Sequence, residues 1–231
     1  DSLPEVKVLM TRTDQNLPGG LRNPSQANRW RAQFANENHG DLFVCIHANA
    51  APPVHHSEIT GHRTKVYYTG RGKHRKRHTR RVPIYHYWTT PSAVRGTETY
   101  VWAVSKNDSK QQFVQTNQDT SELYGEEKDS TMPNLTTEEK IVASIRTRKY
   151  FSRSLFLANL IQDGYQKQGR IIHDDVGNGV KQRNEKGIWV LQATAMPSIL
   201  TETGFLSNPA EEDYLNSQSG QEKGDSAIFN A

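Results

Sequence analysis

The segment Asp-Leu-Phe-Val-Cys-Ile-His-Ala-Asn-Ala (residues 41–50) decides the fold of this 231-residue chain. Its apolar run, residues 42–46, predicts a buried β-strand, and His47 stands where that run ends. A second segment, Leu-Thr-Glu-Thr-Gly-Phe-Leu-Ser-Asn (residues 200–208), places Glu202 after another apolar run and before a glycine turn. Reactive side chains of α/β sheets gather at the carboxyl ends of strands, so His47 and Glu202 are candidate site residues.

An imidazole and a carboxylate at two such strand ends suit a metal ligand and a general base. Taken alone, each residue is a weak signal. A histidine that ends a strand is more often a hydrogen-bonded structural residue, and this alternative stays open for His47.

The residues upstream of this segment predict the fold class. Residues 6–11 predict a buried strand, and residues 25–38 predict a helix in which Ser25 can cap the amino end and apolar residues recur every three or four positions. A strand, a helix and a strand in this order imply a parallel pair with a right-handed crossover. We therefore expect an α/β fold, with a mostly parallel twisted sheet and helices on both faces.

The downstream residues continue this pattern. Strands are expected at residues 98–104, 187–191 and 198–201, and helices at residues 110–123, 137–148 and 151–168. A helix should begin after Asn208, because Pro209 suits its first position and Glu211 its third. The last residues predict one more helix.

A basic insertion, residues 51–96, interrupts the α/β pattern. Nine Lys or Arg residues lie from Arg63 to Arg81, with five Tyr or Trp residues near them. Such a mixture could hold nucleic acid through phosphate contacts and base stacking. A solvated, partly mobile insertion between two strands is the simpler interpretation, and we expect no nucleic-acid partner. The histidines of the insertion lack the compact spacing of a metal site.

Size and composition set further bounds. The chain is long enough for one large domain or two small ones, and its net charge of +4 permits anionic partners without requiring them. No apolar run approaches the roughly 18 residues of a membrane span, and we expect no such span. The single cysteine, Cys45, is expected in the core. The first residues do not have the pattern of a signal peptide, and the sequence opens abruptly at Asp1, so we expect upstream residues to be missing.

Five segments, in this order, resemble the zinc-dependent N-acetylmuramoyl-L-alanine amidases of bacterial cell-wall turnover. They are residues 11–14 (Thr-Arg-Thr-Asp), 41–50, 96–100 (Gly-Thr-Glu-Thr-Tyr), 187–191 (Gly-Ile-Trp-Val-Leu) and 196–212, which begin with Met-Pro-Ser-Ile-Leu-Thr-Glu-Thr-Gly-Phe-Leu-Ser-Asn. The last segment is the most specific. The resemblance implies a phosphorylase/hydrolase-like α/β fold in one catalytic domain, residues 1–231, with insertions at about 51–96 and 105–150.

The resemblance also implies a chemistry. In the family, two His and one Glu hold zinc, whose fourth position binds water and lowers its pKa. A second Glu takes the water proton and passes it to the leaving amine as the amide between N-acetylmuramic acid and L-alanine breaks. His47 matches the second zinc histidine of the family, and Glu202 matches the catalytic glutamate.

One departure from the family concerns the metal. The first family strand, with its Gly-His-Gly-Gly zinc histidine, and the following glutamate ligand have no counterpart in this sequence. Either an upstream segment outside this chain supplies these ligands, or the chain is a fragment without metal and activity. A substitute ligand from the histidine-rich insertion is a weaker alternative. A sheet without its first strand would also expose an unpaired edge.

A second departure concerns regulation. Residues 105–150 resemble the insertion of the cell-division branch, in which a helix plugs the active site and a glutamate reaches the zinc. The matching position is Gln118, with Asp119 and Glu122 nearby. Glutamine is a poor zinc ligand beside a carboxylate, so any inhibition is expected to be steric. A surface insertion without a regulatory role is the alternative.

The resemblance finally implies partners and a location. It implies a peptidoglycan substrate, an activator protein that displaces the plug helix, and a bacterial cell envelope location, periplasmic or secreted. The competing hypothesis is a non-catalytic cell-wall-binding or regulatory module built on the same scaffold.

Overall fold

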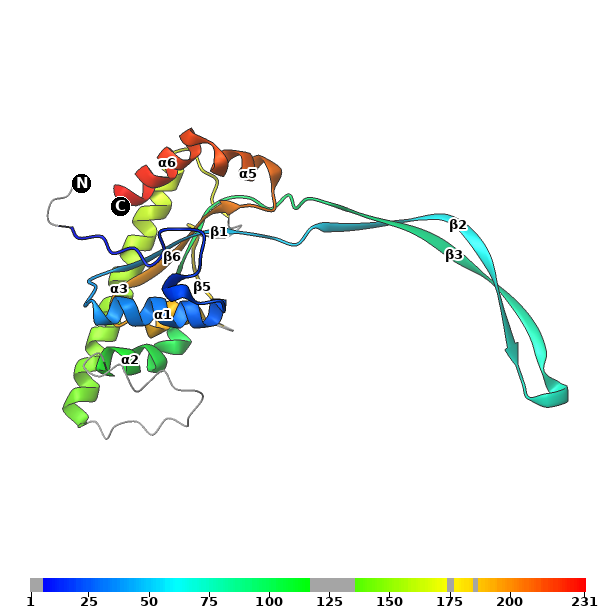
Figure 1. Ribbon diagram of the computed structural model, residues 1–231, viewed down its shortest axis with the longest axis horizontal. Coiled ribbons are helices and arrows are strands. Elements are labelled where there is room, and N and C mark those ends of the chain that lie inside the picture. Colours follow the sequence, from blue (N-terminus) through cyan, green and yellow to red (C-terminus); the bar gives the residue numbers. More distant parts are fainter. Residues whose placement is uncertain (1–5, 117–135, 174–176, 185–186) are drawn as a thin grey trace.

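A computed structural model describes residues 6–116, 136–173, 177–184 and 187–231. Its main sheet has four strands in the order β1-β6-β4-β5, and a separate two-stranded sheet pairs β2 with β3 (Figure 1). The strands are β1 (Phe43–Asn49), β2 (Val54–Thr69), β3 (Lys76–Thr90), β4 (Glu98–Val101), β5 (Val180–Gln182) and β6 (Ser198–Phe205). The helices are α1 (Pro24–Glu37), α2 (Asn107–Thr116), α3 (Thr137–Lys167), α4 (Trp189–Ala193), α5 (Pro209–Asn216) and α6 (Gln218–Phe229), with short 3-10 turns at Pro18–Gly20, Gly72–His74 and Val104–Lys106.

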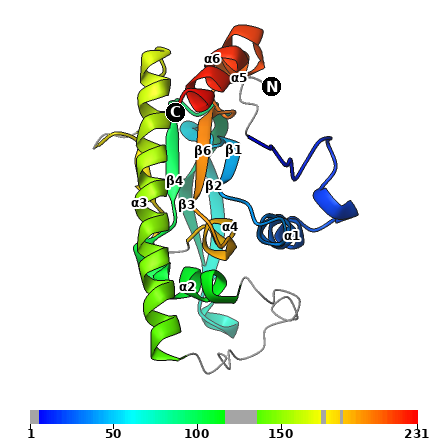
Figure 2. The same cartoon turned by 90° about the vertical axis from the view of Figure 1, so that its left-hand side faces the viewer.

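The pairing of the main sheet confirms the α/β class. The pairs β1–β6 and β4–β5 are parallel, and β4–β6 is antiparallel. Helix α3 lies on one side of these strands, and α1 and α4 lie on the other (Figure 2). Within the described residues, no helix is long and apolar enough to cross a membrane.

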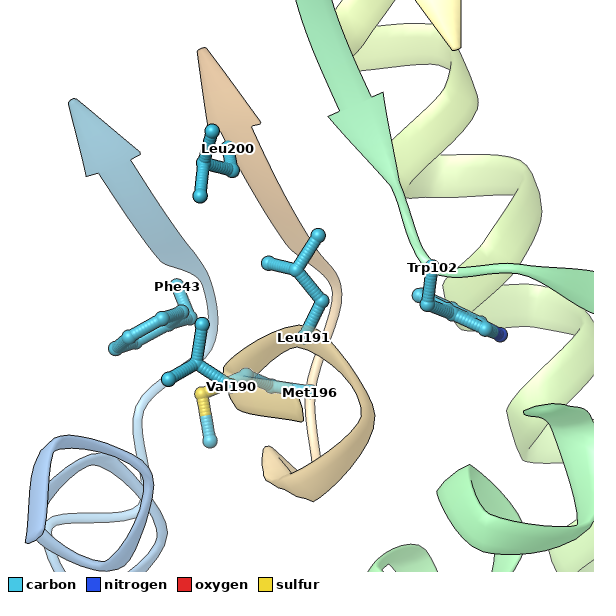
Figure 3. Close-up of a cluster of buried hydrophobic side chains, with 6 residues drawn as sticks. All are labelled: Phe43, Trp102, Val190, Leu191, Met196 and Leu200. Atoms are coloured by element: carbon cyan, nitrogen blue, oxygen red, sulfur yellow. The ribbon is translucent and has the colours of Figure 1, made fainter. Parts of the chain in front are cut away.

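The core has one apolar cluster on each face of the sheet. Neighbouring side chains of a strand point to opposite faces, so Ile199 and Leu200 of β6 enter different clusters. Ile199 packs with residues of α3 and α6, including Ile161 and Ala227. Leu200 belongs to the cluster on the α4 side, whose buried members are Phe43, Trp102, Val190, Leu191, Met196 and Leu200 (Figure 3).

The prediction of a strand at residues 6–11 is wrong. These residues form no strand, and the side chains of Val6 and Val8 are 57% and 75% exposed. A strand needs a neighbour that satisfies its backbone groups, and an apolar run does not supply one. Strand β1 lies at the edge of the sheet, and Val44 and Ile46 on it are exposed, so this strand is buried on one face only and not throughout as expected.

Two local expectations also need correction. Helix α1 begins one residue earlier than expected and is capped by Asn23, whose side chain accepts hydrogen bonds from the backbone of Ser25 and Gln26. Ser25 is therefore not the cap. The segment predicted as a strand at residues 187–191 instead leads into helix α4, where Val190 and Leu191 are both buried. Consecutive buried residues fit a helical turn against the core as well as they fit a strand.

Other elements follow the expected positions closely. The two helices expected at residues 137–148 and 151–168 are one continuous helix, α3, which opens with a capping box between Thr136 and Glu139. Strand β6 and helices α5 and α6 are confirmed, and the Asn208 side chain accepts from the Ala210 backbone at the start of α5. The strand expected at residues 98–104 is the shorter β4.

The basic insertion forms a regular element. Strands β2 and β3 pair along their length as an antiparallel hairpin that extends away from the body (Figure 1). Most of its side chains are exposed, as the prediction of a solvated insertion requires. We call this hairpin the β2–β3 arm.

Candidate active site

Strand register brings the two candidate residues together. Strands β1 and β6 run parallel, and His47 lies opposite Glu202 in their pairing. Strand β4 runs antiparallel to β6 on its other side and places Glu98 opposite Glu202. Directly opposed residues of paired strands point to the same face. Glu202 therefore lies between an imidazole and a second carboxylate, in the carboxyl-terminal halves of β1 and β6.

The Glu202 carboxyl group has an unusual environment. Its Oε2 atom is buried and accepts no hydrogen bond from any described residue. Burial, and secondarily the negative charge of Glu98, raise the pKa of Glu202 to about 7, although Arg183 opposes this change. A carboxyl group with a pKa near neutrality can both take and return a proton at physiological pH.

Glu98 is held by a network of donors. Its side chain is buried, and its Oε1 accepts hydrogen bonds from Asn49 Nδ2 at 2.7 Å and from the Tyr100 hydroxyl at 2.8 Å. Its Oε2 lies 2.8 Å from Lys181 Nζ on β5. These contacts fix Glu98 beside Glu202 and tie its position to the end of β1.

Glu98 has no role of its own in the resemblance, where it is one residue of the segment 96–100. Its partner Lys181 belongs to none of the matching segments. A signal was available, because an acidic residue inside a short strand segment has to be paired or to serve a site. The identity of the partners could not be read, since Asn49 and Lys181 lie 49 and 83 positions away.

The His47 side chain is exposed to solvent on one side and partly desolvated by the residues around it. Its ring is accessible to solvent, yet the groups packed around it, together with the positive charge of Arg31, lower its pKa. A neutral imidazole is the form that binds a metal ion. The backbone carbonyl of His47 accepts a hydrogen bond from the Thr203 hydroxyl at 3.0 Å, which adds a second link between β1 and β6.

The predicted zinc site is incomplete in the part of the chain that the structure describes. There, no group of three or more His, Cys, Asp or Glu side chains is placed to hold a metal ion. A catalytic zinc site needs three protein ligands and an open position, so His47 and its neighbours do not suffice. Nearby Cys45 is half-buried, and burial raises the pKa of its thiol to about 12.

The candidate plug residues Gln118, Asp119 and Glu122 lie outside the described residues. Helices α2 and α3 flank that stretch. Lys110 of α2 is completely buried, and its Nζ lies within 3.1 Å of Leu191 O, Thr194 Oγ1, Met196 O and Ser198 Oγ. Helix α2 is thereby fixed to the loop that leads into β6.

Comparisons with known proteins identify the family of this chain. A family model described as N-acetylmuramoyl-L-alanine amidase matches residues 2–231. The N-acetylmuramoyl-L-alanine amidase AmiC of Neisseria meningitidis serogroup B is 32% identical over 136 residues, which cover 57% of this chain and 29% of that protein. The crystal structure of the N-acetylmuramyl-L-alanine amidase Ami1 from Mycobacterium smegmatis is similar in fold, with a TM-score of 0.50 and 18% identity, and the match covers 95% of this chain and 62% of that one. The chain thus spans less than two thirds of either relative.

Proposed function

The chain belongs to the N-acetylmuramoyl-L-alanine amidase family, and on that premise we propose that it hydrolyses the amide between N-acetylmuramic acid and L-alanine in peptidoglycan. The observation that carries the proposal is the register of His47, Glu202 and Glu98 across three strands, with Glu202 Oε2 left without a partner among the described residues. A buried carboxylate oxygen without a donor is costly unless it serves a ligand or a proton.

Glu202 acts as the general base in this proposal. It takes a proton from the water that attacks the amide carbonyl carbon, and it gives that proton to the nitrogen of L-alanine as the carbon–nitrogen bond breaks. The products are a carboxylate on the muramic acid side and a free α-amine on the peptide. Glu98 is a positioning residue in this proposal, because its negative charge raises the pKa of Glu202.

We further propose that the working enzyme uses zinc and that His47 supplies one ligand. The described residues do not complete the ligand set, so the remaining donors have to come from outside them. Metal analysis tests this assignment. Protein that binds zinc should lose it in His47→Ala and keep it in His39→Ala, because His39 follows α1 and lies in no strand of the sheet. Equal zinc content in both variants would remove His47 from the ligand set.

The regulatory and cellular proposals follow the cell-division branch of the family. We propose that the segment with Gln118, Asp119 and Glu122 restrains the site until an activator protein displaces it. We also propose that the protein works in the bacterial envelope, in the periplasm or after secretion. Deletion of residues 117–135 should raise the hydrolysis rate if the segment inhibits, and an unchanged rate would assign it no regulatory role.

Identification of the cut bond tests the proposed reaction. Purified peptidoglycan should yield peptides with a free amino-terminal L-alanine, detected by mass spectrometry after amine labelling. New reducing sugar ends, or cuts within the peptide, would assign a different reaction. The competing function, a non-catalytic wall-binding module, predicts binding to peptidoglycan without any new amine. The lack of a hydrogen-bond partner for Glu202 Oε2 among the described residues favours the catalytic function over the binding module.

A further inference from the structure

The β2–β3 arm is rooted in the candidate active site. It leaves the body after β1, which carries His47, and returns before β4, which carries Glu98. The hydrogen bond from Asn49 to Glu98 joins the two strands at this root. Ala51 N donates to Ser207 Oγ at 2.8 Å, which ties the departing chain to the loop after β6. The arm therefore begins where Glu202 lies.

The arm is long and has little packing of its own. At about 3.4 Å per residue, strands of 15 and 16 residues span roughly 50 Å. A two-stranded ribbon alone is marginally stable in water. Nevertheless it exposes many large apolar and aromatic side chains, namely Val54, Ile59, Val66, Tyr67, Tyr68, Ile84, Tyr85, Tyr87 and Trp88. Exposed apolar side chains in this number are typical of interaction surfaces.

Charge is strongly segregated onto the arm. The whole chain has 29 Lys or Arg and 25 Asp or Glu residues. Residues 54–90 hold nine of these basic residues and one of the acidic residues. The remaining chain is left with 20 basic and 24 acidic residues, and is net negative. The single acid of the arm is Glu58, near its root, so the distal half is uniformly positive.

Each face of the arm carries both rings and cations, and the following pairs lie on one of these faces. Tyr67 pairs with His78, and their rings stack at 5.2 Å. Two residues further along the same face, Lys65 pairs with Arg80, and the next pair on that face contains Arg63. Nearer the root, one extra residue in β2 shifts the register, which brings the stacked pair of His56 and Trp88, also 5.2 Å apart, to this same face.

This pattern fits a polymer that has both ring surfaces and anionic groups. Guanidinium and ammonium groups bind carboxylates, and the flat apolar faces of aromatic rings pack against the C–H faces of sugars. Peptidoglycan offers sugar rings along its glycan and carboxylates on its stem peptides. We propose that the β2–β3 arm is a second substrate-binding surface that holds the carboxylate-bearing glycan–peptide strand beside the scissile amide; this inference rests on the proposed amidase function.

Matched charge variants test the proposal in the full chain. The arm variant is Arg63→Gln, Lys65→Gln and Arg80→Gln. The control is Arg146→Gln, Arg148→Gln and Lys149→Gln on α3, which removes the same charges from equally exposed positions off the arm. Both variants carry Glu202→Gln, so that the purified peptidoglycan sacs used for co-sedimentation are not cleaved. Each exposed ion pair contributes modestly to the binding free energy. The arm variant should therefore bind sacs at least about fivefold more weakly than the parent, while the control should bind them as tightly as the parent does.

Treatment of the sacs distinguishes the source of the anions. Sacs whose carboxylates are coupled to a neutral amine should lose binding to the parent, and sacs stripped of phosphate-bearing polymers should keep it. Equal sac binding by arm variant and parent overturns the proposal, as does an equal loss in the control. Tighter binding of the parent to a single-stranded oligonucleotide than to sacs would assign the arm to nucleic acid instead.

An activity readout separates this inference from the proposed function. With Glu202 restored, the arm variant should cleave a small soluble muramoyl-peptide at the parental rate and lose rate only on sacs. Absence of cleavage of either substrate by the zinc-loaded parent would reject the amidase function. Equal rates of variant and parent on sacs would reject the arm as a substrate-binding surface.

Discussion

The buried pair of Arg170 and Glu211 gives the sharpest prediction about how the site is held. Glu211 Oε1 lies 2.8 Å from Arg170 Nη2, and the two side chains are only 7% and 11% exposed. Glu211 Oε2 accepts from the backbone N–H groups of Gly96 and Phe205, both at 2.9 Å. Gly96 precedes the strand that carries Glu98, and Phe205 ends the strand that carries Glu202. One carboxylate thus joins both site strands.

Glu211→Gln should destabilise the fold by about 3 kcal/mol, because breaking a buried ion pair leaves Arg170 uncompensated, at a typical cost of about 3–5 kcal/mol. The amide keeps one acceptor oxygen, which preserves part of the contact with the backbone donors. Its NH2 group must face either Arg170 or those donors. The exposed neighbour Glu212 supplies the control, and Glu212→Gln should change stability by about 0.5 kcal/mol or less.

Urea unfolding followed by tryptophan fluorescence measures both variants. A double-mutant cycle adds Arg170→Met, and the double variant should lose less stability than the two single variants together, because the second change removes the partner that the first leaves unpaired. A loss below about 1 kcal/mol in Glu211→Gln, or strict additivity in the cycle, would refute the role given to this pair.

Three further predictions concern single residues. Lys110→Met should lower the unfolding free energy by about 2 kcal/mol, since Met196 O loses a buried donor, and an unchanged melting temperature would contradict this. Gly96→Ala should lower the unfolding free energy by about 1–3 kcal/mol, because Gly96 has φ +110° and a Cβ would lie 2.7 Å from His173 N. An unfolding free energy in urea equal to that of the parent would contradict this strain. The folded Glu202 pKa of about 7 exceeds the ordinary 4.5, so the folded state keeps a proton that the unfolded chain releases, and this group's contribution to stability falls as pH rises through that window. With chelator present, the unfolding free energy of Glu202→Gln should therefore equal that of the parent near pH 4.5 and exceed it by about 1 kcal/mol at pH 8. This figure allows for the partial exposure of the Glu202 side chain. A difference in unfolding free energy that stays constant with pH would contradict the raised pKa.

Sequence reasoning located the elements whose signals are local. The start of α5 is set by adjacent residues, Asn208 and Pro209, and the sequence placed it correctly. Strand β6 has a long buried run with no competing interpretation. The candidate residues His47 and Glu202 were readable because each ends an apolar run, and the structure places them side by side. Their roles as zinc ligand and general base stay predictions.

The remaining features depend on partners far away in the chain. Residues 6–11 are apolar but lack a neighbouring strand, and residues 189–193 fold as a turn of helix because the core, and not the sequence pattern, sets their geometry. The pairing of the β2–β3 arm requires a register that alternation of basic and aromatic residues does not specify. The position of Glu98 beside Glu202 depends on the pairing of β4 with β6, which the residues of β4 do not specify.

The most direct test of the account compares peptide release from purified peptidoglycan by the parent and by Glu202→Gln at pH 8, with zinc supplied. If Glu202 moves the proton, the variant remains folded, binds sacs as the parent does and releases amino-terminal L-alanine peptides at least about a thousandfold more slowly, within the usual range for losing a general base. Release by the folded variant at a rate near that of the parent would contradict the account.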